Sequence, residues 1–122
     1  MAEPNLVNVT SIYGRTVNTT LDTTLTTDIL TCPSNKVIKI NTIIVSNIDG
    51  SNSADVTVYF YNNSAASRTQ IANTVAVPAD STLVVIGKDS PIYLEENDQL
   101  EARADAASDA ELVVSYEILN DA

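Results

Sequence analysis

The chain has 122 residues, of which 44% are hydrophobic and 18% charged, and this composition predicts one small globular domain with a single core. Six Lys and Arg residues against 16 Asp and Glu residues give a formal net charge of −10, which disfavours binding to nucleic acid or to anionic membranes. Histidine is absent, so a Ser-His-Asp or Cys-His catalytic site cannot be built within this chain. We therefore expect no catalytic residue, no cofactor and no enzymatic activity.

The sequence shows no basic-then-apolar leader at its start, and its uninterrupted apolar runs reach only about four residues, as in Leu83–Ile86. A helix that spans a bilayer needs about 20 apolar residues. We expect a protein that carries no export signal and does not enter a membrane.

The first strand is expected over Leu6–Val17, in a part of the chain that is rich in Thr and Asn and poor in apolar residues. Such a segment can be an edge strand, or an arm that pairs with the sheet of a neighbouring subunit. We expect residues 1–20 to form this arm or edge strand and residues 21–122 to form the sandwich domain.

The next strands are predicted from clusters of Thr, Val and Ile over Thr24–Leu30 and Lys36–Ser46. In the strand that follows, Val56, Val58 and Phe60 share one face, while Asp55, Thr57, Tyr59 and Tyr61 share the other. That alternation is typical of a half-buried strand, and we assign it to Ala54–Tyr61.

The second half of the chain continues in the same way, with strands expected over Thr69–Val77, Thr82–Ile86 and around Pro91–Leu94. Apolar and polar residues then alternate in Leu100–Ala104 and in Leu112–Ile118. The Ala-rich stretch 102–110 is the best candidate for a helix, but a strand, a turn and a second strand explain it better. Short strands joined by turns predict an all-β fold, a single antiparallel β-sandwich of jelly-roll or immunoglobulin-like type.

Two turns concentrate oxygen ligands of the kind that Ca²⁺ prefers. Neither has the spacing of a calcium loop, because Gly50 directly follows Asp49 and no Glu stands at the twelfth position. We expect a solvated turn, and no metal, at both places. The residues concerned are Asp49, Ser51, Asn52, Ser53 and Asp55 in the first turn and Glu95, Glu96 and Asp98 in the second.

Tyr59 and Tyr61 are the candidate interaction residues, because the alternation places them outside the core and tyrosine offers a large rigid surface with a polar tip. The alternative is that they only cover a face of the sheet. Cys32, the single cysteine, precedes Pro33 and is expected to pack as a small apolar side chain at the end of a strand.

Four segments resemble small virion structural proteins of tailed bacteriophages, especially those of cyanophages and other marine phages. They are residues 45–58, 71–86, 91–100 and 106–117, within a resemblance that covers about residues 37–118. Where those proteins usually place Gly after the Glu-Glu pair, this chain has Asn97. Asn replaces Gly well in a left-handed turn, so we expect the turn to be kept.

The resemblance implies a virion component without enzymatic activity, assembled in the host cytoplasm. The first expectation is a capsid decoration (cement) protein that binds other virion proteins, the major capsid protein foremost, and forms a homo-oligomer for which a trimer is one arrangement. The alternatives are a component of the tail, neck or a fibre, and a carbohydrate-binding module that uses Tyr59 or Tyr61.

Overall fold

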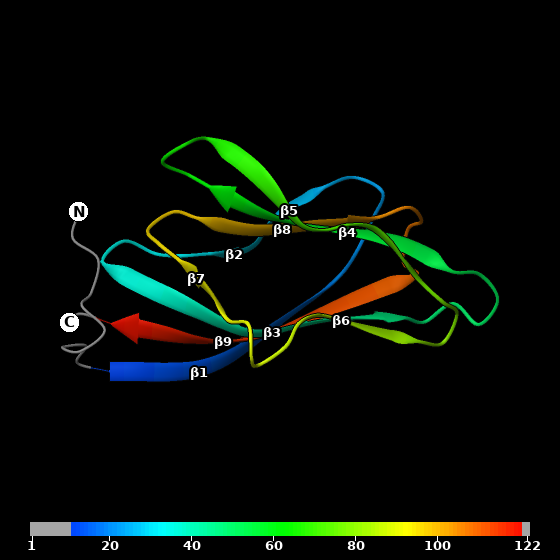
Figure 1. Cartoon of the computed structure of the whole chain (residues 1–122), viewed down its shortest axis with the longest axis horizontal. Helices are drawn as coiled ribbons and strands as arrows, with labels where there is room; N and C mark the ends of the chain where they lie inside the picture. Colours follow the sequence, from blue (N-terminus) through cyan, green and yellow to red (C-terminus); the bar gives the residue numbers. More distant parts are fainter. Residues whose placement is uncertain (1–10, 121–122) are drawn as a thin grey trace.

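The structure is a computed structural model that describes residues 11–120, and within this range it consists of strands and turns without a helix (Figure 1). The expected all-β class is therefore confirmed. The nine strands are β1 (Ser11–Thr20), β2 (Thr26–Thr31), β3 (Lys36–Asn47), β4 (Ala54–Asn62), β5 (Ser67–Val77), β6 (Thr82–Ile86), β7 (Ile92–Leu94), β8 (Gln99–Ala104) and β9 (Ala110–Asn120).

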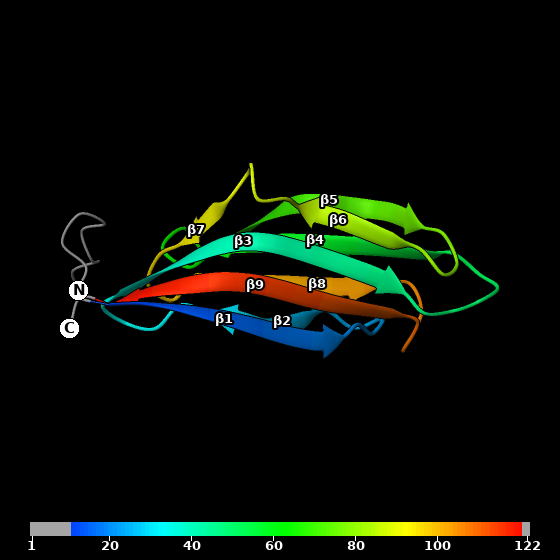
Figure 2. The same ribbon diagram turned by 90° about the horizontal axis from the view of Figure 1, so that it is seen from below.

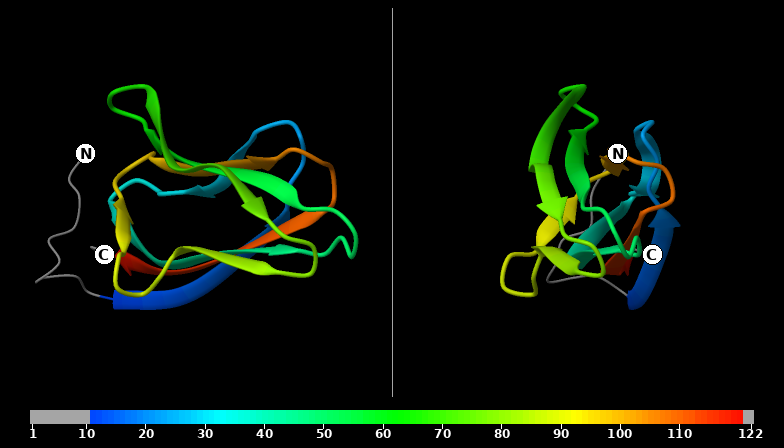
Figure 3. Two further views of the ribbon diagram at one scale, coloured as in Figure 1. Left: turned by 45° about the vertical axis from the view of Figure 1, so that its right-hand side comes forward. Right: turned by 90° about the vertical axis from the view of Figure 1, so that its right-hand side faces the viewer.

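The strands form two antiparallel sheets that lie face to face (Figures 1 and 3). The five-stranded sheet has the order β1-β9-β3-β6, and β7 also pairs with β3. The four-stranded sheet has the order β2-β8-β4-β5. The predicted antiparallel β-sandwich is thus confirmed.

The pairing joins strands that are far apart in the sequence. The first strand pairs with the last, β2 pairs with β8, and β3 pairs with β6 and β7. Only β4 and β5 are neighbours both in the chain and in the four-stranded sheet, and the other consecutive strands, apart from β6 and β7, lie in different sheets. The chain therefore crosses between the two layers at most of its connections.

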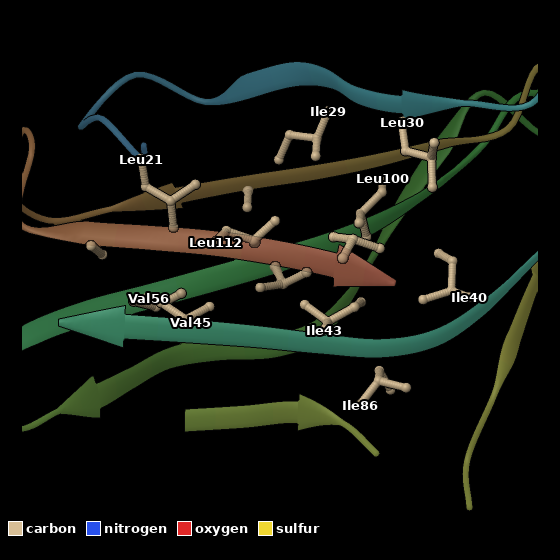
Figure 4. Close-up of a cluster of buried hydrophobic side chains, with 14 of the residues drawn as sticks. Leu21, Ile29, Leu30, Ile40, Ile43, Val45, Val56, Ile86, Leu100 and Leu112 are labelled. Atoms are coloured by element: carbon tan, nitrogen blue, oxygen red, sulfur yellow. The ribbon is translucent and has the colours of Figure 1, made fainter. Parts of the chain in front are cut away.

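The core fills the space between the sheets, and period-two alternation decides which side chains enter it. In β9, Leu112 and Val114 are fully buried while Val113 between them is 41% exposed. Burial of such side chains contributes about 1.5–3 kcal/mol each. Figure 4 shows inward side chains that include Leu21, Ile29, Leu30, Ile40, Ile43, Val45, Val56, Ile86, Leu100 and Leu112.

Strand bounds agree closely with the sequence expectations, and Thr82–Ile86 agrees at both ends. The Ala-rich stretch is confirmed as a strand ending at Ala104, a turn, and a strand beginning at Ala110. Asn97 has a φ of 66°, which confirms the left-handed turn expected at this position. Of the first predicted strand, residues 6–10 lie outside the described residues, and β1 extends beyond the predicted end to Thr20.

Of the two interpretations of the first 20 residues, the described part takes the edge position. All ten residues of β1 pair with β9, and no described strand lies on the other side of β1 (Figure 2). The domain boundary after residue 20 stays a prediction, and β1 on the N-terminal side of it pairs along its whole length with β9 on the other side.

Candidate interaction surface

The outer face of the four-stranded sheet carries the two candidate tyrosines. Tyr59 lies opposite Glu101 of β8, and Tyr61 lies between Gln99 of β8 and Arg68 of β5. Both tyrosines are half-buried, so they are less exposed than the alternation alone predicted. The reason is that side chains of two neighbouring strands pack beside them. We call the set Tyr59, Tyr61, Arg68, Gln99 and Glu101 the tyrosine cluster.

Glu101 is the residue of this cluster that sequence reasoning missed. As a polar residue of the alternating stretch Leu100–Ala104, it belongs to the outward face of β8, yet it is only 1% exposed. Its carboxylate keeps its polar partners, because Nε of Arg68 donates a hydrogen bond to Oε1 at 2.5 Å. When the side-chain amide of Gln99 is oriented so that its oxygen and its nitrogen both have suitable hydrogen-bond partners, the nitrogen donates to Oε2 of Glu101 at 3.1 Å. The outward face of β8 therefore buries a charge with its counterion.

Arg68 links this carboxylate to an aromatic ring. Its guanidinium carbon lies 5.0 Å from the centroid of the Tyr61 ring, a distance suited to a cation–π contact. The hydrogen bond to Glu101 raises the pKa of Arg68 above its ordinary value. The guanidinium therefore contacts both Tyr61 and Glu101 and links the aromatic ring to the buried carboxylate.

A pocket of about 290 Å³ lies further along the same face of β4 and β8. Thr57 and Arg103 are opposite each other there, two pairs along the strands from Tyr59 and Glu101 and therefore on the same face. Arg103 forms no ion pair within the described range, so its charge is available to a polar ligand. No aromatic side chain lines the pocket, whose residues are Thr23, Asp55, Thr57, Thr74, Arg103, Ala104 and Asp105.

The first acidic turn uses its oxygens to hold the chain itself. Asp49 accepts a hydrogen bond from the Ser51 N–H at 2.8 Å and a second from the Asn52 amide at 3.3 Å. The amide of the buried Asn47 donates to the carbonyls of Asn52 and Val77, each at 2.9 Å. Because these bonds tie the Asp49 carboxylate and the Asn47 amide to the backbone, they stabilise the conformation of the turn.

The second acidic turn is built in the same way. Asp98, only 4% exposed, accepts hydrogen bonds from the N–H groups of Asn63 at 3.0 Å and Glu95 at 3.1 Å. Glu96 accepts one from the N–H of Asn35 at 2.7 Å. Between residues 11 and 120, no three Asp, Glu or Cys side chains are grouped so that they could hold a metal ion.

Cys32 is fully buried one position beyond the end of β2, and its thiol donates to the carbonyl of Lys36 at 3.1 Å. The expectation that it packs in the core is confirmed.

No helix in the part of the chain that the structure describes is long and apolar enough to cross a bilayer.

The similarity of this chain to known proteins lies in its fold, as a comparison with solved structures shows. No protein-family model and no curated protein matches the chain. A chain of the acidic stable capsid structure of Helicobacter pylori bacteriophage KHP30 is similar, with a TM-score of 0.56 at 10% identity, over 93% of this chain and 91% of that one. A chain of the Bacillus endospore appendages, a family of disulfide-linked pili, gives a TM-score of 0.55 at 13% identity, over 92% and 88% of the two chains. At these identities, the likeness shows a shared sandwich fold.

Proposed function

We propose that this chain is a structural protein of the virion of a tailed bacteriophage, a capsid decoration protein that binds the major capsid protein and is assembled in the host cytoplasm. The observation that carries the proposal is the likeness to a phage capsid chain over about nine tenths of both chains. The sequence resemblance to small virion proteins of cyanophages and other marine phages, which spans β3 to β9, supports it independently.

The strand order supports the same proposal. If β6 and β7 count as one interrupted strand, the first strand pairs with the eighth, the second with the seventh, the third with the sixth and the fourth with the fifth. We assign this order to a jelly roll rather than to an immunoglobulin-like sandwich, because a jelly roll wraps paired strands from sheet to sheet. Viral capsid domains are among the proteins built on that fold.

The likeness to a pilus chain does not favour a pilus for this chain. That neighbour belongs to a family of disulfide-linked pili, whereas this chain has a single cysteine, Cys32, which is fully buried. A buried thiol in the core cannot join two neighbouring subunits while the domain stays folded. The virion is therefore the assembly that the residues support best.

Quantitative mass spectrometry of purified particles tests the proposal. A decoration protein has a copy number that scales with the number of capsid subunits, whereas a tail, neck or fibre component is present in a few copies that match the tail symmetry. Absence of the chain from washed particles would contradict any virion role. Binding of the purified chain to capsids that lack it, and stabilisation of those capsids against heat, would support the decoration role directly.

The carbohydrate-binding alternative has a separate test. Arg68 already contacts the ring of Tyr61, both tyrosines are half-buried, and no aromatic ring lines the adjacent pocket, so little flat surface is left for stacking on a sugar. We expect no binding on a glycan array. Binding that a Tyr59→Ala, Tyr61→Ala double variant abolishes would establish the alternative and displace the capsid proposal.

A further inference from the structure

The two sheets have four edges, and three of them are protected against pairing with another chain. The edge next to β3 consists of two short strands, five and three residues long, separated by a turn that contains Pro91. The edge strand β2 has six residues and an irregular register with β8. Short, interrupted or irregular edges are poor templates for a further strand.

The third protected edge is β5. It is eleven residues long, but its register with β4 shifts twice, and Thr74 has a φ of 52°. The N–H of Thr74 donates to the hydroxyl of Thr57 at 3.0 Å instead of to a backbone carbonyl. A bulged strand of this kind twists locally and breaks the regular row of N–H and C=O groups that a partner strand needs.

The fourth edge, β1, has none of these features. Its ten residues pair with β9 in one continuous register, without a bulge, a proline or an acidic residue, and Arg15 is its one charged side chain. In an antiparallel edge strand, alternate residues direct their N–H and C=O groups away from the sheet. About half of the residues of β1 therefore direct their backbone groups away from β9, where no described strand pairs with them. Figure 2 shows β1 at this edge of the five-stranded sheet.

The side chains of β1 also favour an added strand. Ile12 is 56% exposed and Tyr13 is 51% exposed, on opposite faces of the strand, and they are two of the six large hydrophobic residues that the described range exposes. Thr16, Thr19 and Thr20 are β-branched, which suits a strand that is paired on both sides. A partner strand would cover part of Ile12 and Tyr13 and satisfy the free backbone groups.

We infer that β1 is the interface through which two copies of this chain join, by antiparallel β1–β1 pairing that continues the five-stranded sheet across a two-fold axis. Within a second copy, β1 is the one described edge that is long and regular enough to pair with β1. Because β1 carries no carboxylate, the two strands meet without bringing acidic side chains into direct opposition, despite the net charge of −10 on each chain.

The two-fold axis also limits the register. Residues directly opposite each other share a face of the sheet, so an even-numbered residue must lie opposite an even-numbered one. A register centred on Arg15 would place this cation opposite itself, and one centred on Val17 would pair only residues 14–20. A register centred on Thr16 pairs residues 12–20 and places Arg15 opposite Val17. We assign this register to the interface.

Disulfide trapping tests both the interface and its register. In the assigned register, residue 16 lies opposite its own symmetry mate, at a Cα separation of about 4.5–5.5 Å that a disulfide can bridge. Asn18 is also exposed on the same face, but its symmetry mate lies about 13 Å along the partner strand from the residue directly opposite Asn18. The full chain carrying Thr16→Cys should form a disulfide dimer at least about tenfold faster than the chain carrying Asn18→Cys. Cys32 is buried in both, and the unsubstituted chain is the background control.

Charge variants provide a second measurement that does not depend on thiol chemistry. Thr16→Lys and Thr16→Glu each place like charges opposite each other and should weaken self-association by about fivefold, as seen by sedimentation equilibrium. An equimolar mixture of the two variants should restore it, because opposite charges then face each other. Equal trapping at positions 16 and 18, trapping at neither, or no restoration in the mixture would overturn the inference. The pairing is a property of the purified chain, so its outcome is independent of whether the chain is found on particles.

Discussion

The Nε of Arg68 donates a hydrogen bond to the Oε1 of Glu101 at 2.5 Å, and this contact joins a half-exposed cation to a carboxylate that is only 1% exposed. The two partners therefore differ. If Glu101 is removed, water can solvate the half-exposed guanidinium of Arg68. If Arg68 is removed, water cannot reach the buried carboxylate of Glu101. A buried charge that loses its counterion is costly, whereas an exposed one is not.

This asymmetry predicts which single substitution is the more harmful. Glu101→Gln should lower the free energy of unfolding by about 1 kcal/mol, because the amide keeps part of the hydrogen bonding. Arg68→Met should lower it more, because it leaves the Glu101 carboxylate buried without its cation. Urea unfolding measures both. The double variant Arg68→Met, Glu101→Met should be more stable than Arg68→Met alone, and the reverse order would contradict this account.

Leu112 and Val113 are neighbours in β9 that point to opposite faces of the five-stranded sheet. Leu112 is fully buried, and its replacement by Ala should cost about 3 kcal/mol, the range found for large-to-small changes in a core. Val113 is 41% exposed, and Val113→Ala should change stability by no more than about 0.5 kcal/mol. Thermal unfolding of the two variants checks the assignment of faces. Similar losses of stability in Leu112→Ala and Val113→Ala would show that the assignment of the two faces of β9 is wrong.

Asp49 makes stability depend on pH in a defined direction. The hydrogen bond from the Ser51 N–H, helped by the Asn52 amide, lowers the pKa of Asp49 below its ordinary value of 3.8. A depressed pKa stabilises the folded state at pH values above 3.8, and this contribution is lost as the pH falls through the lower pKa of the folded protein. The difference in Tm between the unsubstituted chain and Asp49→Asn should therefore be larger at neutral pH than at pH values below 3.8.

A matched control for Asp49 is Asp89→Asn. Asp89 is exposed, and its carboxylate accepts no hydrogen bond from the described residues. Its replacement should shift Tm little. A difference for Asp49→Asn that does not change with pH would show that the Ser51 contact does not stabilise the turn.

Alternation in the sequence predicted which face of each strand enters the core, because a side chain's direction in a strand depends only on its position within that strand. Val56, Val58, Leu100 and Leu112 are all buried as this rule requires. Glu101 is the exception in β8. Its hydrogen-bond partner Arg68 is 33 positions away in the chain and becomes a neighbour only through the order of strands.

Strand order itself could not be read from the sequence for the same reason. The pairing of β1 with β9 joins Ser11 to Asn120, and no local pattern encodes a contact over that separation. Turn chemistry was more informative. Asn97 at a φ of 66° and the hydrogen bonds around Asp49 follow from the preferences of single residues for particular backbone conformations.

Deletion of residues 1–20 tests whether the remaining residues fold as a domain of their own. This change removes β1, leaves β9 as an edge strand and takes away the packing of Val17 against the core. We expect a lower Tm and increased aggregation, because β9 would then be a long uncovered edge. The control is a chain that lacks only residues 1–10 and keeps β1. Equal Tm values for the two truncated chains would show that residues 21–122 fold without β1.

Asn97 occupies a left-handed turn, with a backbone conformation that favours Gly. A side chain with a β-carbon is disfavoured at a φ of 66°, and Asn tolerates this conformation better than most residues. Asn97→Ala should therefore lower the free energy of unfolding by about 1 kcal/mol, whereas Asn97→Gly should leave it unchanged or slightly higher. Chemical denaturation measures both, and Asn97 is exposed, so neither variant alters the core. If Asn97→Ala proved as stable as Asn97→Gly, backbone conformation would not be the reason for Asn at this position.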